Sequence, residues 1–246
     1  MLLLVNTLFG AVESLWHFNI KVLGQTRLDG LARDYGQRVL KLTCGEPWSE
    51  RAHMLNYCLI NDISGFPRLK SLHIHHDVTN AVMQTFPHTV CHLSLSECYF
   101  DDHGLQSLPR ANLQSLSLCE CPNVTDAGLS HFENLCHLRL NYIDQVQALF
   151  LPPKLKSVFL HACPRVMTIP ALPELRTLSV QYCHRFQGSA VTFLPNLRVL
   201  QVRHCQLVQD TPRIAQEHLE RGRVLVDKFH PRSRHQLRYA SYRFHV

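Results

Sequence analysis

Residues 113–129 read LQSLSLCECPNVTDAGL, and the leucines in the first half of this stretch follow the spacing L-x-x-L-x-L. The same spacing recurs along most of the chain. Seven copies begin at Leu69, Val90, Leu113, Leu135, Leu155, Leu175 and Leu197. Their starts are separated by 21, 23, 22, 20, 20 and 22 residues. A period this steady indicates a repeat protein, in which each copy forms one unit of a stack.

Each copy is predicted to contain one short strand. Side chains alternate along a strand, so Leu116 and Leu118 should point into the core while Ser115, Ser117 and Cys119 point to the opposite face. A single copy cannot bury its leucines, but stacked copies join them into one continuous core and align their strands. We therefore predict an α/β fold, a curved solenoid whose parallel sheet lines the concave side.

A degenerate earlier copy is predicted in residues 28–42, LDGLARDYGQRVLKL. Its first position is Gln37, and Leu40 and Leu42 take the two inward positions of the strand. Cys44 then falls one place short of the ninth position. The repeats are therefore expected to begin near residue 37.

A cysteine column marks the ninth position of the repeat. It holds Cys98, Cys121, Cys163, Cys183 and Cys205, with Asp77 and Ile143 as exceptions. A thiol is small, easily buried and a weak hydrogen-bond donor, and no C-x-x-C pair is present, so buried structural thiols are favoured over a zinc or redox site. Ten cysteines in this arrangement favour free thiols and an intracellular location, cytoplasmic or nuclear.

The residues after the cysteine predict what covers the convex side. In residues 121–129, Thr125 or Asp126 can cap a short helix that carries Leu129 and Phe132 toward the core. Later copies are rich in proline, as in VMTIPALPEL and FLPNL. Proline disfavours the helix interior, so these backs are expected to be extended or a single 3₁₀ turn.

The phrase CPNVTDAGL resembles the C-x-x-[IV]-T-D-x-G-L phrase of the cysteine-containing leucine-rich repeat, familiar from the substrate-recognising F-box proteins of cullin ubiquitin ligases. The resemblance covers about residues 37–226. It implies a leucine-rich repeat solenoid, a role in substrate recognition and a cullin ligase adaptor as a partner. No L-P-x-E-[IL] start of an F-box type occurs in the first forty residues. The proline-rich copies look more like the shorter repeats of bacterial effectors, so a pathogen effector that binds a host protein is an alternative.

Both ends of the solenoid need covers, because a terminal repeat exposes its leucines. Residues 1–36 are predicted to form a helical cap, with apolar residues at helical spacing at Leu4, Leu8, Val12, Leu15 and Phe18. The opening MLLLVNTLFGAV lacks the basic region and cleavage site of a signal peptide. Residues 37–229 form the repeat domain, ending in a short helix after Thr211 and a last strand in RVLVDKF. Residues 230–246 form a tail.

The tail holds most of the excess positive charge. Residues 213–246 contain eight arginines or lysines against three acids, which is +5 of the total of +6. The end, HPRSRHQLRYASYRFHV, alternates basic and aromatic residues. Such a pattern can bind RNA or an acidic protein surface. A solvated terminus is the alternative.

The concave face supplies the candidate partner-binding residues, which share positions three, five, seven and eight of the repeat. They are His73, His75, His92, His137, Arg139, Tyr142, Phe159, His161, Tyr182, Gln201, Arg203 and His204. Tyrosine and arginine are frequent anchors of protein interfaces. The histidines would strengthen contact with an acidic partner as the pH falls toward about 6.5. His73 and His75, with His92 on the next strand, have the spacing of two or three metal ligands, but an evolved metal site is not predicted.

The expected function is a non-enzymatic module that binds a protein partner. The sequence contains no nucleophile elbow, phosphate loop, H-E-x-x-H or cysteine-protease signature. The sequence contains no run of about eighteen apolar residues, so no membrane span is predicted. No cofactor is expected. RNA binding through the basic tail is a further alternative.

Overall fold

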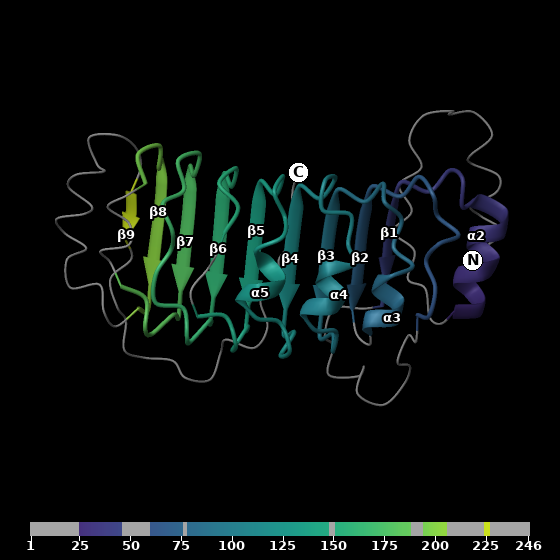
Figure 1. Cartoon of the computed structure of the whole chain (residues 1–246), viewed down its shortest axis with the longest axis horizontal. Helices are drawn as coiled ribbons and strands as arrows, with labels where there is room; N and C mark the ends of the chain where they lie inside the picture. Colours follow the sequence, from purple (N-terminus) through teal and green to yellow (C-terminus); the bar gives the residue numbers. More distant parts are fainter. Residues whose placement is uncertain are drawn as a thin grey trace.

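The computed structural model describes residues 25–45, 60–75, 78–147, 151–187, 194–205 and 224–226. Within them, nine parallel strands form a single sheet in the order β1 to β9, so each strand pairs with the next one along the chain (Figure 1). The strands are β1 (Lys41–Cys44), β2 (Ser71–His75), β3 (His92–Ser96), β4 (Ser115–Cys119), β5 (His137–Asn141), β6 (Ser157–His161), β7 (Thr177–Gln181), β8 (Val199–Arg203) and β9 (Val224–Val226). The predicted solenoid with a parallel sheet is confirmed.

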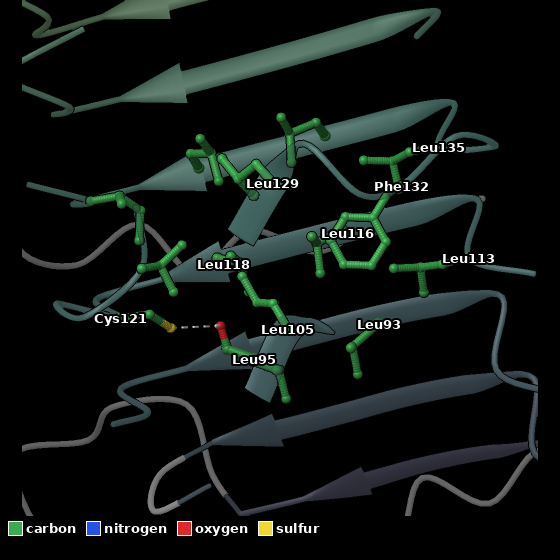
Figure 2. Packing of buried hydrophobic residues seen from close by; sticks show 14 of the residues in the cluster. Leu93, Leu95, Leu105, Leu113, Leu116, Leu118, Cys121, Leu129, Phe132 and Leu135 are labelled. Atoms are coloured by element: carbon green, nitrogen blue, oxygen red, sulfur yellow. Dashed lines mark hydrogen bonds between the residues drawn. The ribbon is translucent and has the colours of Figure 1, made fainter. Parts of the chain in front are cut away.

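The leucines of the repeat form columns that run across the sheet. Leu93 pairs with Leu116 and Leu95 with Leu118, and the same register continues to β5. Leu116 and Leu118 are almost completely buried, at 1% and 0% exposure. Figure 2 shows them packed between the sheet and the residues of the convex side, including Phe132. Because neighbouring copies bury each other's leucines, the core is continuous along the stack.

Short helices cover the early part of the convex side. They are α3 (Asn80–Met83), α4 (Asp102–Gln106) and α5 (Asp126–Leu129), and α2 (Gln25–Tyr35) lies at the N-terminal end of the stack (Figure 1). The Thr125 side chain caps α5 by accepting a hydrogen bond from the Ala127 N–H at 3.2 Å. Leu129 and Phe132 are buried, as predicted. Residues 164–175, in the proline-rich part, contain no helix, in agreement with the prediction that this back is extended or a single 3₁₀ turn.

The convex side is also tied together by carboxylates that reach the next copy. Asp102, the first residue of α4, accepts hydrogen bonds from the Thr125 N–H at 2.9 Å and the Thr125 hydroxyl at 2.6 Å. Asp126, the first residue of α5, accepts one from the Gln147 N–H at 3.0 Å. The Thr-Asp pair of the repeat therefore caps its own helix and fixes the following copy.

The register predicted for the first copy is wrong by two residues. β1 pairs Leu42 with Leu72 and Cys44 with Ile74, so these two residues take the inward positions of the strand. Val39, not Gln37, fills the first position, and it is fully buried. Both registers place the same alternating residues of the strand toward the core. Burial distinguishes them, because Gln37 is exposed and its polar side chain would lose its hydration if it filled the first position in the core.

The ends of the stack are described only in part. Leu28 of α2 is buried against the core, in agreement with an N-terminal helical cover, while residues 1–24 lie outside the described residues. At the other end, β9 pairs in parallel with β8, which confirms the predicted last strand. The predicted helix after Thr211 and the tail 230–246 also lie outside the described residues. The division into 1–36, 37–229 and 230–246 stays a prediction.

Candidate functional site on the concave face

The concave face is the face of the sheet opposite the leucine core. Alternate residues of each strand reach it, as the alternating burial along β5 and β6 shows. All twelve predicted residues lie on this face or directly after a strand. Three of them, His73, His75 and His92, lie on β2 and β3. Six lie on β5, β6 and β8, and Tyr142, Tyr182 and His204 directly follow β5, β7 and β8. The intervening β4 contributes only Ser115, Ser117 and Cys119 to this face.

A row of residues in left-handed backbone conformation follows the strands. They are Glu97, Glu120, Tyr142, Ala162, Tyr182 and His204, with φ between 51° and 56°. The N–H of each of the two tyrosines donates to the last carbonyl of the next strand, Tyr142 to His161 and Tyr182 to Arg203, both at 2.9 Å. A left-handed residue interrupts the alternation of the strand. Positions seven and eight therefore both stay outside the core, and position nine turns inward.

Four rings from this row and the strand ends form an aromatic ridge, made of Tyr142, His161, Tyr182 and His204. His161 contacts Tyr142 and Tyr182 edge to face, with ring centroids 5.2 Å apart in both pairs. Tyr182 and His204 are stacked at 4.3 Å. Tyr142 keeps 37% of its surface exposed. The ridge is thus a continuous, partly exposed aromatic rim along one edge of β5 to β8.

Beside the ridge lies a shallow hollow of about 150 Å³, here called the Arg139 hollow. The Arg139 guanidinium lies over the Phe159 ring, 4.7 Å from its centroid, in a cation–π contact. The other residues that line the hollow are Asn141, Leu160, His161, Ser179, Gln181 and Gln201. Pockets that hold small-molecule ligands usually measure about 300–1,000 Å³. The hollow therefore has room for one side chain rather than for a whole small molecule.

Polar side chains on the floor of the hollow are hydrogen-bonded to one another. The Gln201 amide is best oriented with its oxygen accepting from Arg203 Nε and Nη2, both at 3.0 Å, and its nitrogen donating to the Ser179 hydroxyl at 3.1 Å. Gln181 Nε2 donates to the same hydroxyl at 3.2 Å. Ser179, Gln181 and Asn141 were missing from the predicted residues. The signal for them existed, since they occupy positions five and seven of their copies.

Burial keeps several histidines of this face neutral. It lowers the pKa of His73 to about 4, with nearby His75 and Lys41 acting in the same direction. Burial is also the main cause that lowers the pKa of His92, His137 and His161. For these four residues the predicted gain of positive charge near pH 6.5 is therefore wrong, and charging is displaced to lower pH.

The histidines of β2 and β3 are not brought together as a metal site would require. The register pairs His73 with Ser94 and His92 with Ser71, so His92 is not the lateral neighbour of His73. Among the described residues, no group of three or more His, Cys, Asp or Glu side chains is arranged to hold a metal ion.

The cysteine column lies at the inward turn after each strand. The Cys121 thiol donates to the Cys119 carbonyl at 3.4 Å and more weakly to the Leu95 carbonyl of the preceding copy at 3.9 Å (Figure 2). Cys163 repeats this pattern with His161 and Leu140. All nine described cysteines are free thiols, and four of the five in the column are fully buried. The predicted burial as free thiols is confirmed for Cys98, Cys121, Cys163 and Cys183, while Cys205 is partly buried.

Comparisons with known proteins show the fold and no closer relationship. No protein-family model matches the sequence, and no curated protein matches it. Among solved structures, the chain is similar to one from the crystal structure of the Rad7 and Elc1 complex in yeast, with a TM-score of 0.51 and 18% sequence identity. The match covers 73% of this chain and 53% of the other, so this chain spans about half the length of its structural neighbour. In the described part of the chain, no helix has the length and apolar character needed to cross a membrane.

Proposed function

We propose that this chain is a non-enzymatic interaction module that binds a protein partner on the concave face over β5 to β8. The observation that carries the proposal is the Arg139 hollow bordered by the aromatic ridge. Tyrosine and arginine are among the residues that contribute most to protein interfaces, above all near the centre of a buried patch. The parallel sheet holds these side chains on a regular backbone, so little conformational freedom needs to be lost on binding.

The dimensions of the site support a macromolecular partner. The hollow is too small for a typical ligand, yet the ridge beside it extends across four strands, from Tyr142 after β5 to His204 after β8. A protein can cover such an extended surface and place a single side chain in the hollow.

The absence of enzymatic activity is part of the proposal, and the chemistry of Cys119 supports it. This is the cysteine that β4 presents on the concave face. Burial, reinforced by Glu120, raises its pKa to about 12. Nucleophilic catalysis by cysteine needs the thiolate, which is scarce near neutral pH at such a value.

The more specific form of the proposal is substrate recognition in a cullin ubiquitin ligase. It is supported by the resemblance of residues 121–129 to the repeats of F-box proteins, in which the Thr125 cap and Asp126 now have defined roles. The similar fold of a protein crystallised in a Rad7 and Elc1 complex agrees with it. The alternative, a pathogen effector that binds a host protein, is supported by the extended, proline-rich back of residues 164–175.

Affinity capture from cell lysate tests the proposal with three forms of the chain. They are the wild type, a concave-face variant with Arg139→Glu and Tyr182→Ala, and a control with Arg165→Glu and Tyr99→Ala. The control changes the same residue types at exposed positions outside the concave strands. We expect a protein partner that the wild type and the control retain and the concave-face variant loses.

Two results decide between the versions of the proposal. Equal recovery of every protein by all three forms would refute binding through the concave face, provided that thermal unfolding shows all three to be folded. A cullin adaptor among the retained proteins would support the ligase version. A host protein without any ligase component would support the effector version.

A further inference from the structure

The two halves of the sheet differ in the charged residues of the concave face. None of the strands β1 to β8 contains aspartate or glutamate. The first half presents Lys41 of β1, and the second half presents Arg139 of β5 and Arg203 of β8. The left-handed row differs between the two halves in the same sense. It carries Glu97 and Glu120 after β3 and β4, but Tyr142, Ala162, Tyr182 and His204 after the later strands. The charge of the face is therefore unevenly distributed.

A second group of cations lies where the same strands begin. Lys156, Arg176 and Arg198 directly precede β6, β7 and β8, and all three side chains are exposed. They are here called the basic edge. Their backbones form a ladder, in which the Arg176 N–H donates to the Lys156 carbonyl at 2.9 Å and the Arg198 N–H to the Arg176 carbonyl at 2.8 Å. Neighbouring strands lie about 4.8 Å apart, so the three cations follow each other at close spacing.

The basic edge is a run of three successive cations that the earlier strands lack. The equivalent positions before β3, β4 and β5 hold Cys91, Gln114 and Cys136, which carry no positive charge, and Lys70 before β2 is a single cation. Glu174 is the acidic residue beside the edge, where it lines a surface hollow of about 320 Å³ with Arg176, Asn196 and Arg198. One acid against three cations leaves the edge positive. A negatively charged partner would complement the basic edge electrostatically.

We infer that the concave face over β5 to β8 recognises an acidic, extended segment of a partner protein, with one carboxylate in the Arg139 hollow and a second on the basic edge. This inference rests on the proposed function and specifies its partner. The guanidinium of an arginine can hold a carboxylate through two parallel hydrogen bonds. The amides of Asn141 and Gln181 on the floor of the hollow add polar groups around it.

The spacing of the two charged groups suits an extended peptide. The basic edge precedes the central row of the strands, which contains Arg139, by three residues. At about 3.3 Å per residue this corresponds to about 10 Å along the strand. Two acidic residues three positions apart in a polyproline II conformation lie on the same side of the chain and about 9 Å apart, because this conformation has three residues per turn and a rise of about 3.1 Å per residue. The geometry therefore favours a partner segment in which two acidic residues are three positions apart.

The packing of the aromatic ridge favours a peptide over a single-stranded nucleic acid. Proteins bind single strands by stacking bases on open aromatic faces. Here His161 lies edge to face between Tyr142 and Tyr182, and one face of Tyr182 is covered by His204. Much of the surface of these rings is therefore covered by neighbouring rings. The ridge forms a rim and does not present a set of open ring faces on which bases could stack.

Selection of displayed random twelve-residue peptides tests the inference. The selection is run in parallel on the wild type, on Arg139→Gln, and on Arg165→Gln as a control of equal charge change at an exposed position outside the concave strands. We expect aspartate and glutamate to be enriched in the peptides recovered by the wild type and the control, often three positions apart. The affinity of such a peptide should fall about tenfold or more with Arg139→Gln, and with the triple variant of Lys156, Arg176 and Arg198 to glutamine.

The outcomes separate this inference from the proposed function. Peptides that depend on Arg139 but are not enriched in acids would overturn the acidic partner while leaving protein binding on this face intact. Binding of a labelled ten-nucleotide single-stranded RNA that depends on Arg139, without any peptide enrichment, would overturn it in favour of a nucleic acid. Equal binding of acidic peptides by all variants would show that residues other than those of the hollow and the basic edge recognise the acids, and it would also overturn the inference.

Discussion

Acidification should destabilise the solenoid through His73. This residue lies in the middle of β2, between Thr43 of β1 and Ser94 of β3. Its pKa is about 4 in the folded chain, mainly because of burial, against about 6.5 when it is exposed. The unfolded chain therefore binds more protons between pH 4 and pH 6.5, and the free energy of unfolding falls as the pH falls through this window.

The magnitude follows from the two pKa values. Full protonation of His73 costs about 3 kcal/mol, because each tenfold change in proton affinity is worth about 1.4 kcal/mol. Between pH 7.5 and pH 5.0 the expected loss from this residue is about 2 kcal/mol. The lowered pKa values of His92, His137 and His161 act in the same direction, so the wild type should lose more than this in total.

Urea unfolding of the wild type and of His73→Gln at pH 7.5 and pH 5.0 isolates the effect. The glutamine is neutral at both pH values, and the difference between the two proteins cancels the groups that they share. We expect the wild type to lose about 2 kcal/mol more than the variant on acidification. His184→Gln, at an exposed position, controls for the removal of one histidine. Equal losses in the wild type and His73→Gln, within about 0.5 kcal/mol, would refute the assignment of a buried neutral imidazole.

Three further predictions concern the stability of the stack and are checked by urea unfolding at pH 7.5. Leu116→Ala should cost about 2–5 kcal/mol, because it opens a cavity in the continuous core, and a loss below about 1 kcal/mol would contradict that packing. Gly128→Ala should cost about 1–3 kcal/mol, since its Cβ would meet the Asp102 carboxylate and lie 2.8 Å from a Leu105 methyl, whereas Gly30→Ala, with nothing within 4 Å, should be neutral or stabilising. Ala162→Gly should stabilise by up to about 1 kcal/mol, because alanine at φ 51° carries a strain that glycine does not, and a clear loss would show that this turn is not left-handed in solution.

The strands could be predicted because their signal is repeated and each copy supports the others. Leu116 and Leu118 are recognisable as inward residues once the same spacing is found in six other copies. β1 was placed two residues away because this copy has a cysteine, Cys44, at the second inward position, where the other copies have leucine, isoleucine or valine. With Leu40 also present, two registers satisfy the apolar pattern. Only the pairing with β2 distinguishes them.

The candidate site was predicted in its position but not in its chemistry. The concave positions follow from the alternation of the strand, so Arg139, Phe159 and Tyr182 could be placed on this face. Their mutual contacts could not, because the cation–π pair and the ring packing depend on side-chain conformations across neighbouring strands. The low pKa of His73 was missed for a related reason. A residue on an open sheet face is expected to be hydrated, whereas the neighbours of His73 bury most of its imidazole.

The basic edge could not be predicted because it lies at the second position of the repeat, which the strand pattern assigns to neither face. This position belongs to neither the leucine columns nor the alternating strand residues. Its members become neighbours only through the backbone ladder that joins Lys156, Arg176 and Arg198. In the sequence they are single cations about twenty residues apart.

The left-handed residue that follows each of the strands β3 to β8 separates the constraints on the core from those on the rim. The residues at this position belong to neither the leucine columns nor the cysteine column, and the backbone accepts glutamate, tyrosine, alanine and histidine there with the same φ to within a few degrees. Substitution at this position can therefore change what the rim recognises, one copy at a time, while the scaffold keeps its shape. New binding preferences could arise here, or be engineered here, without redesign of the interior.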